Sequence, residues 1–461
     1  MNFKELSEKY TDSMIEDLRQ LIAIPSLLDL QSATEHAPFG VNVRKSLDWM
    51  LEKAKADGFD VLDIDGYAGV ISFGQGEESV GVLGHLDIVP IGEGWTKDPF
   101  GGEIVDGIMY GRGTGDDKGP TMAAYTAMKM LKDIDPNPKR KIMLIVGCDE
   151  ETGMRCMKHY LEVGEIPTMG FVPDAGFPVI YGEKGILNVK LSGKHPSVIS
   201  SFHAGERPNI VIGKASVTID GPVKKDELDF YAQATRTFAN YTVNENLVTY
   251  TFMGTYSHAS TPQHGLNAAV HALNFVGVAY NDTAAAQMSQ LVFDYHGRAI
   301  NNFVEGAHMG NLTSNLGIVS IENGMVELTL DIRYPNDVSF DMIMEKLNRR
   351  VLQVAPWLSI DVIAHKEPMF VDPQSELVST LMNVYQEMTG DTFTPALTMG
   401  GGTYARTLPN FVAFGMQFPK RNRPDFVGDA HQKDEGIFVE DLVLATAIYA
   451  EALKRLAYEN A

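Results

Sequence analysis

Cysteine is scarce in this sequence, and the scarcity bears on both fold and location. Cys148 and Cys156 are the only two among 461 residues, and no spaced set of cysteines and histidines surrounds them. We therefore expect neither a disulfide framework nor a structural zinc site built on thiolates. A reducing compartment is the default for such a chain, which predicts a cytoplasmic protein.

Positive charge and long apolar runs are also lacking. The 38 Lys and Arg residues are outnumbered by 60 Asp and Glu residues, which gives a formal net charge of −22. Sequence-independent nucleic-acid binding needs a basic surface that replaces counterions, so we expect no nucleic-acid partner. No segment approaches the roughly 18 to 20 apolar residues of a membrane span. The N-terminus contains no apolar core typical of a signal peptide, and we expect no membrane partner.

The length favours two domains, because single hydrophobic cores rarely grow this large. Apolar runs alternate with helical patterns in the first and last parts of the chain, which predicts a mainly parallel sheet flanked by helices. The predicted strands are 80–83, 141–147, 170–173 and 411–416. The predicted helices are 3–23, 41–57, one that opens at Pro120, 375–389 and 438–457.

The middle of the chain has a different pattern, with longer alternating runs between helices. The runs are 186–192, 246–253, 315–321 and 325–333, and the helices lie near 226–238, 265–280 and 339–354. Asn323-Gly324 separates two of the runs and is typical of a hairpin turn. We predict an inserted α+β domain at 186–370, between the two parts of the first domain at 1–185 and 371–461.

Acids and histidines follow several of the predicted strands. They are His85, Asp87, Asp116, Asp117, Asp149, Glu150, Glu151, Asp174 and His431. Functional groups collect at the carboxyl ends of strands in open α/β sheets. Carboxylates crowded into one crevice would be forced to protonate, and a divalent cation relieves that conflict. Two histidines and three carboxylates suit a pair of Zn²⁺ or Mn²⁺ ions.

Such a pair of ions can activate water and polarise a carbonyl oxygen, and amide hydrolysis needs both. No Gly-x-Ser-x-Gly motif is present, which disfavours a serine hydrolase. The residues alone do not separate Asp116 from Asp117, and they do not assign the roles within 149–151.

Six motifs occur in an order that resembles one known family. They are Gly-His-Leu-Asp, Gly-Thr-Gly-Asp-Asp-Lys-Gly-Pro, Asp-Glu-Glu, Pro-Asp-Ala, Ser-His-Ala-Ser-x-Pro and Gly-Gly-Thr-Tyr-Ala-Arg. The sequence is similar, over essentially its whole length, to the cocatalytic metallopeptidases that include carnosinases, aminoacylases and carboxypeptidase-G-type enzymes. Within that family it most resembles the bacterial PepV-type dipeptidases. The resemblance implies an α/β catalytic domain with the insertion as a large α+β lid.

The resemblance also implies roles for individual residues. The implied metal ligands are Asp117 as the bridge between two ions, His85 and Asp174 at one ion, and Glu151 and His431 at the other. Glu150 would be the general base for the metal-bound hydroxide, Asp87 would orient His85, and His258 would stabilise the oxyanion. The implied substrate contacts are Asn209, Arg333, Gly401, Thr403 and Arg406.

The function predicted in this way is hydrolysis of dipeptides with a free amino terminus. A large lid favours a small peptide substrate. The resemblance to PepV-type dipeptidases, in which a doubled lid substitutes for a dimer partner, implies a monomer. Two alternatives stay open. One is an N-acyl-amino-acid deacylase of the deacetylase or desuccinylase type, with the same metals and a different pocket. The other is a relative that binds metal without turnover.

Overall fold

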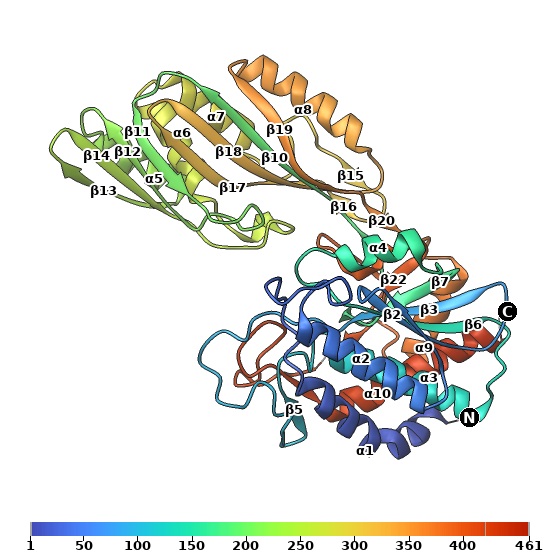
Figure 1. The fold of residues 1–461 in the computed structure, drawn as a ribbon. Helices are drawn as coiled ribbons and strands as arrows, with labels where there is room; N and C mark the ends of the chain where they lie inside the picture. The colour runs from blue at the N-terminus through green and yellow to red at the C-terminus, as the bar shows by residue number, and fades with distance from the viewer. Residues whose placement is uncertain (1, 420, 460–461) are drawn as a thin grey trace. The chain divides into compact units, whose positions relative to one another are not determined.

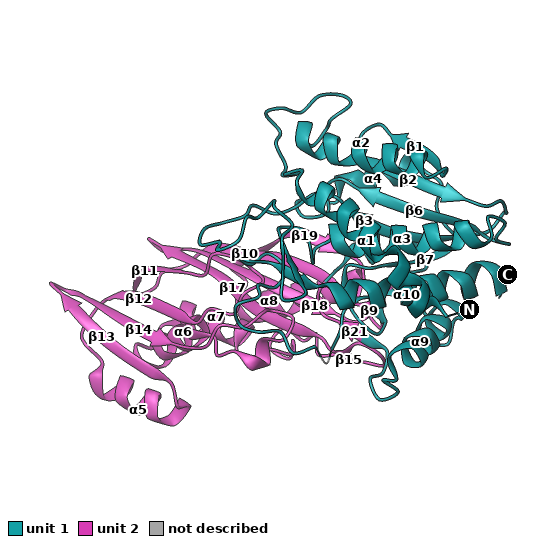
Figure 2. Ribbon diagram, turned by 90° about the horizontal axis from the view of Figure 1, so that it is seen from below, with its two compact units in different colours: residues 1–181, 370–397, 402–461 teal, residues 182–369, 398–401 magenta. Residues whose placement is uncertain are grey.

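A computed structural model describes residues 2–419 and 421–459. It divides the chain into two compact units, coloured separately in Figure 2. Unit 1 comprises residues 1–181, 370–397 and 402–461, and unit 2 comprises residues 182–369 and 398–401. The predicted limits of the insertion, 186 and 370, lie near these boundaries. The assignment of 398–401 to unit 2 was not expected from the sequence.

Four mutually parallel strands form the centre of the sheet in unit 1 (Figure 1). In spatial order they are β6 (Lys141–Gly147), β3 (Ser79–His85), β7 (Met169–Val172) and β22 (Phe411–Ala413). They are the four strands predicted from the sequence. The sheet continues through β1 (Asp60–Ile64) and β2 (Ala68–Phe73) beside β6, and through β9 (Ile180–Glu183), β20 (Met369–Phe370) and β21 (Leu397–Met399) beyond β22. The predicted mixed sheet is confirmed; its four central strands are parallel, whereas β1 with β2, β2 with β6 and β22 with β9 pair antiparallel.

Helices of unit 1 pack against this sheet and against one another. They are α1 (Phe3–Ile22), α2 (Val41–Ala56), α3 (Lys118–Ile134), α4 (Arg155–Val163), α9 (Glu376–Thr389) and α10 (Val439–Lys454). α3 lies against β3 and β6 and packs on α1 and α10. The helix begins at Lys118, two residues before the predicted start at Pro120. Proline fits anywhere in a first turn, because the N–H groups there have no acceptor within the helix.

Unit 2 contains an eight-stranded antiparallel sheet. Its order is β13 (Phe238–Asn244), β14 (Leu247–Met253), β12 (Lys214–Asp220), β11 (Ile199–Ala204), β17 (Thr313–Glu322), β18 (Met325–Tyr334), β10 (Gly185–Lys194) and β19 (Leu358–Lys366). Its helices are α5 (Lys225–Thr235), α6 (Ala268–Ala279), α7 (Thr283–Val292) and α8 (Phe340–Val354). Asn323 and Gly324 join β17 to β18 with φ of 52° and 72°, which confirms the predicted hairpin. The predicted α+β character is confirmed as well.

Short pieces complete the chain. They are β4 (Ile104–Val105), β5 (Ile108–Tyr110) and β24 (Gly436–Phe438) in one small sheet, the pairs β8 (Ala175–Gly176) with β23 (Met416–Gln417) and β15 (Glu305–Gly306) with β16 (Gly310–Asn311), and the helical turns Pro262–His264, Tyr404–Thr407 and Arg455–Glu459. Among the described residues, no helix is both long and apolar enough to cross a membrane.

Candidate metal centre

His85 is the last residue of β3, and its ring is fully buried among acids. Its Nδ1 lies 3.0 Å from the main-chain oxygen of Asp87. Its Nε2 lies 3.0 Å from Asp116 Oδ1 and 3.7 Å from Asp174 Oδ2. A bond from Nδ1–H to a carbonyl leaves Nε2 as the atom available to a metal. The end of β3 therefore presents one imidazole nitrogen to two carboxylates.

His431 approaches the same acids from a loop far along the chain. Its Nε2 lies 2.9 Å from Asp116 Oδ2 and 3.0 Å from Glu151 Oε1. Asp116 thus has one carboxylate oxygen beside each histidine. Two groups of possible ligands result, and Asp116 belongs to both. They are His85, Asp116 and Asp174, and Asp116, Glu151 and His431, each with ligand atoms within 4.8 Å of one another.

Asp117 belongs to neither group. Its Oδ2 accepts hydrogen bonds from the His85 main-chain N–H at 3.0 Å and from Thr121 Oγ1 at 2.9 Å. Its Oδ1 is buried and has no hydrogen-bond partner among the described residues. The carboxylate lies at the contact between β3 and α3, where its Oδ2 binds the main chain of His85 and the hydroxyl of Thr121. This geometry favours Asp116 for the shared position, and the choice between Asp116 and Asp117 as the bridge stays a prediction.

Asp87 contacts His85 and also holds the loop that follows β6. Its Oδ1 accepts the N–H of Glu150 at 3.0 Å and its Oδ2 accepts the N–H of Glu151 at 3.1 Å. Glu151 belongs to a ligand group, whereas Glu150 does not. Among the described residues, the Glu150 carboxylate takes part in no hydrogen bond or ion pair. Asp87 therefore fixes His85 through its main-chain oxygen, and Glu150 and Glu151 through its carboxylate, relative to one another.

Without a metal ion, several side chains of this cluster have raised pKa values and therefore tend to hold protons. Burial raises the pKa of Glu150 to about 7 and that of Asp174 well above its usual range, with neighbouring carboxylates adding to both shifts. Hydrogen bonds to Asp116 and Glu151 raise the pKa of His431 to about 10. Burial opposes a charge on His85, yet its acidic partners outweigh burial and raise its pKa too.

These groups fit divalent cations. In the absence of metal, bound protons reduce the repulsion between the clustered carboxylates. A divalent cation in either group would replace those protons. The donor set of two imidazole nitrogens and three carboxylates is one that Zn²⁺ and Mn²⁺ accept. The residues present can therefore hold the pair of ions that the sequence predicts.

Unit 2 brings together three residues predicted to face the substrate from the lid. Asn209 accepts the N–H of Ala259 through its main-chain oxygen at 2.9 Å, which places it beside His258. His258 is exposed, and its Nδ1 accepts the N–H of Ser260 at 3.1 Å.

Arg333, the third of these residues, is already engaged within unit 2. Its guanidinium makes a two-pronged ion pair with Asp331. The same side chain donates to Gly400 O at 3.1 Å, next to Gly401.

Thr403 and Arg406 belong to unit 1, like the acid cluster. Thr403 Oγ1 accepts the N–H of Ala405 at 3.1 Å and caps the turn Tyr404–Thr407. Because the lid residues and the acids belong to different units, their action on one substrate stays a prediction.

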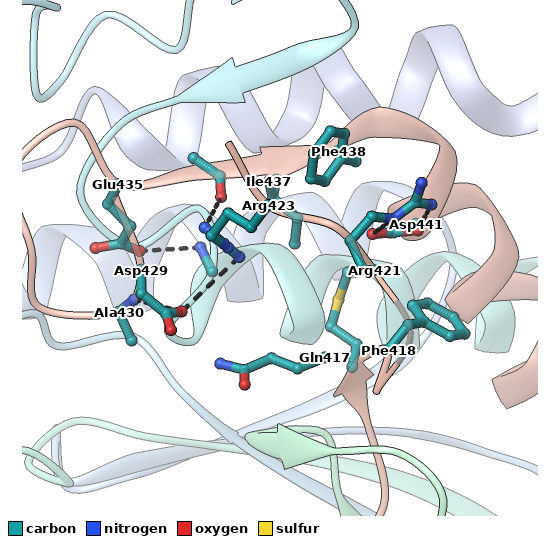
Figure 3. Close-up of a pocket in the computed structure, with 13 residues that line it drawn as sticks. Gln417, Phe418, Arg421, Arg423, Asp429, Ala430, Glu435, Ile437, Phe438 and Asp441 are labelled. Carbon is teal, nitrogen blue, oxygen red and sulfur yellow. Dashed lines mark hydrogen bonds and ion pairs between the residues drawn. The ribbon is translucent and has the colours of Figure 1, made fainter. Parts of the chain in front are cut away.

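A cavity of about 230 Å³ lies beside the loop that carries His431 (Figure 3). Gly115 and Ala430 line it, and they directly precede Asp116 and His431. Glu435 also faces it, from the end of the same loop. Sequence patterns gave no reason to single out Glu435, whose contacts with the Gly113–Asp116 turn join residues some 320 positions apart.

The sequence model that describes peptidase family M20/M25/M40 matches residues 81–455, which include every candidate ligand. The chain belongs to peptidase family M20/M25/M40. It is 36% identical over 473 residues to the Bacillus subtilis protein named "Putative dipeptidase YtjP", covering 99% of this chain and 100% of that one. It is 34% identical over 476 residues to a Staphylococcus epidermidis "Putative dipeptidase", with the same coverage. This M20 chain is thus a metal-dependent peptidase.

Solved structures of low identity share the fold of this M20 chain. PepT, an aminopeptidase from Bacillus cereus, superimposes with a TM-score of 0.57 at 14% identity, covering 96% of this chain and 99% of that one. Human carnosine dipeptidase 1 gives a TM-score of 0.52 at 15% identity, covering 98% of both chains.

Proposed function

We propose that this M20 peptidase hydrolyses dipeptides with a free amino terminus and that two divalent ions, Zn²⁺ or Mn²⁺, serve the reaction. The observation that carries the proposal is the placement of Asp116, which offers one carboxylate oxygen beside each of two histidines. The dipeptidase names of its curated relatives support the substrate class. The proposed ligands are His85, Asp116 and Asp174 at one ion and Asp116, Glu151 and His431 at the other.

Glu150 is the proposed general base. When bound, the two ions supply an activated water and polarise the scissile carbonyl. Glu150 accepts the proton of that water and returns it to the leaving amine. Its position supports this role, because it follows a strand end, lies next to a ligand and has a carboxylate that other side chains leave unengaged. Asp87 accepts the main-chain N–H of Glu150 through its carboxylate and orients His85 through its main-chain oxygen.

His258 is the proposed oxyanion donor of the lid. Its Nδ1 accepts the Ser260 N–H, so a neutral ring carries its proton on Nε2, which is then the donor. Asn209 and Arg333 are proposed to contact the substrate from the same unit, and Gly401, Thr403 and Arg406 to border its carboxylate end. Arg333 would have to share its guanidinium with Asp331 to do so.

A hydrolysis panel on metal-depleted protein, reloaded with Mn²⁺ or Zn²⁺, tests the function. The panel contains dipeptides with free amines, the same dipeptides acetylated at the amine, tripeptides, and acetylated and succinylated amino acids. We expect turnover of free dipeptides and little of the others. Preference for acylated amino acids would establish a deacylase instead, and no hydrolysis with either metal would contradict a catalytic role.

A further inference from the structure

Arg112 and Glu435 form an ion pair that is almost completely removed from solvent. Each side chain is 1% exposed, and Arg112 Nη1 donates to Glu435 Oε2. Charged side chains are rarely buried in this way unless they are paired. Both carboxylate oxygens of Glu435 and both terminal nitrogens of Arg112 have partners, whereas Arg112 Nε has none among the described residues. The partners of this pair lie in the two segments that carry Asp116 and His431 and in the segment that follows β3.

Glu435 holds the turn that leads to Asp116. Its Oε1 accepts three main-chain N–H groups, from Gly113 at 3.0 Å, Gly115 at 2.9 Å and Asp116 at 3.3 Å. The turn therefore wraps around one carboxylate oxygen immediately before α3 begins. Hydrogen bonds to a charged acceptor are stronger than those between neutral groups, so the main chain of Asp116 is firmly placed.

Arg112 holds the loop that carries His431. Its Nη1 donates to Gln432 O at 3.2 Å and its Nη2 donates to His431 O at 3.3 Å. The same Nη2 reaches the carbonyls of Pro90 and Ile91, each at 3.3 Å. The guanidinium thus ties the His431 loop to the segment just after β3.

His431 needs such support. Its side chain is 52% exposed, so packing does little to place it. Its φ of 66° lies in the left-handed region, which a residue other than glycine keeps only where the surroundings impose it. The bond from Arg112 to its carbonyl is one of the contacts that impose it.

We propose that Arg112 and Glu435 are positioning residues of the metal centre and that this one ion pair places both Asp116 and His431. The inference rests on the proposed two-metal function. The group Asp116, Glu151 and His431 takes two of its three ligands from the segments held by the pair, whereas the group His85, Asp116 and Asp174 takes one. Loss of the pair weakens both ion sites, and it weakens the His431 site more.

Calorimetric titration of the metal-depleted full chain with Mn²⁺ tests the inference, using Glu435→Gln. This change keeps the shape of the side chain but removes its charge and places an amide against Arg112. We expect affinity at the His431 site to fall about 10- to 100-fold, the usual effect of losing a group that orients a ligand. A His431→Ala titration identifies which binding step belongs to that site. Activity of Glu435→Gln recovers as Mn²⁺ is raised, and circular dichroism of the metal-depleted variant shows that it is folded before the metal is added.

Glu376→Gln is the control, at a glutamate that also pairs with a buried arginine but is itself 37% exposed. Glu376 pairs with Arg140, a 7% exposed arginine of the same unit that also binds Glu78 and Leu456 O. None of these residues belongs to a ligand group. We expect this variant to lose thermal stability and to keep both Mn²⁺ affinities.

Removing one half of a buried ion pair can prevent folding, so a second variant accompanies the first. Arg112→Met with Glu435→Leu leaves no lone charge, and such replacements are often tolerated. A folded variant with wild-type affinity at both steps would overturn the inference. If the wild type itself binds fewer than two ions, the proposed function falls and the inference with it, whereas two ions in the wild type and unchanged variants refute the inference alone.

Discussion

Asp116 and Asp117 are neighbours in the chain but do different work. Asp116 lies between two histidines, whereas Asp117 accepts hydrogen bonds from His85 N and Thr121 Oγ1. Sequence alone could not separate them, because which of two adjacent carboxylates enters the crevice depends on the backbone of one turn. The identities of the other proposed ligands could be inferred, since each follows a predicted strand or matches a family motif.

Replacement of each acid separates the two roles. We expect Asp116→Ala to lower affinity at both ion sites by more than about 100-fold, because both groups contain Asp116. Asp117→Asn keeps an acceptor for the His85 N–H and should retain both ions. Metal content after gel filtration, measured by mass spectrometry, gives the answer. Two ions bound to Asp116→Ala, with none on Asp117→Asn, would restore the original assignment.

The variant Glu150→Gln tests whether Glu150 is a general base or a metal ligand. Glu150 lies outside both ligand groups, so we expect this variant to keep two ions while kcat falls by about 10² to 10⁴. Glu151→Gln is the matched comparison one residue away and should lose affinity at one site. Metal analysis beside steady-state rates distinguishes them, and loss of an ion from Glu150→Gln would mean that Glu150 is itself a ligand.

At the scale of the elements, the central strands were predictable because parallel strands are buried on both faces and read as continuous apolar runs. β3 is buried along its whole length. β1 was missed because most of its residues are exposed, so burial gives it no pattern. Contacts between distant segments, such as Glu435 with the turn before α3, leave no local signal at all.

The close approach of β3 and α3 depends on Gly84, the residue before His85. A Cβ at this position would lie 2.0 Å from Thr121 Oγ1 and 2.8 Å from Asp117 Oδ2. We expect Gly84→Ala to lower the free energy of unfolding by about 1 to 3 kcal/mol through overpacking and to weaken metal binding by displacing His85. Urea denaturation measures the first effect.

Gly176→Ala is a suitable control for that variant. Its added Cβ would have its nearest neighbour at 3.7 Å, an ordinary contact. Equal stability losses in the two variants would contradict the steric explanation for Gly84.

For the whole molecule, metal binding should be coupled to pH. Asp116 and Glu151 raise the pKa of His431 to about 10, so the free protein holds a proton there at neutral pH. A metal ion requires the neutral imidazole, and its binding must therefore release that proton. Affinity should rise with pH until the pH reaches that pKa, by about tenfold per pH unit for each proton released.

Calorimetry in two buffers of different ionisation enthalpy measures the released protons. We expect the apparent binding heat at pH 7.5 to differ between the buffers, and the difference to shrink in His431→Ala. Identical heats in both buffers would show that the centre is already deprotonated.

The position of β22 between β7 and β9 has a consequence for synthesis on the ribosome. β7 and β9 are complete by residue 183, yet the strand that separates them comes from residues 411–413. The eight strands of the large sheet in unit 2 all lie between residues 185 and 366. The nascent chain can therefore close the sheet of unit 2 while the sheet of unit 1 still lacks an inner strand. The sheet of unit 1 cannot be completed until residues 411–413 have been synthesised. Until then the edge of β7 is unpaired and accessible to chaperones and to aggregation.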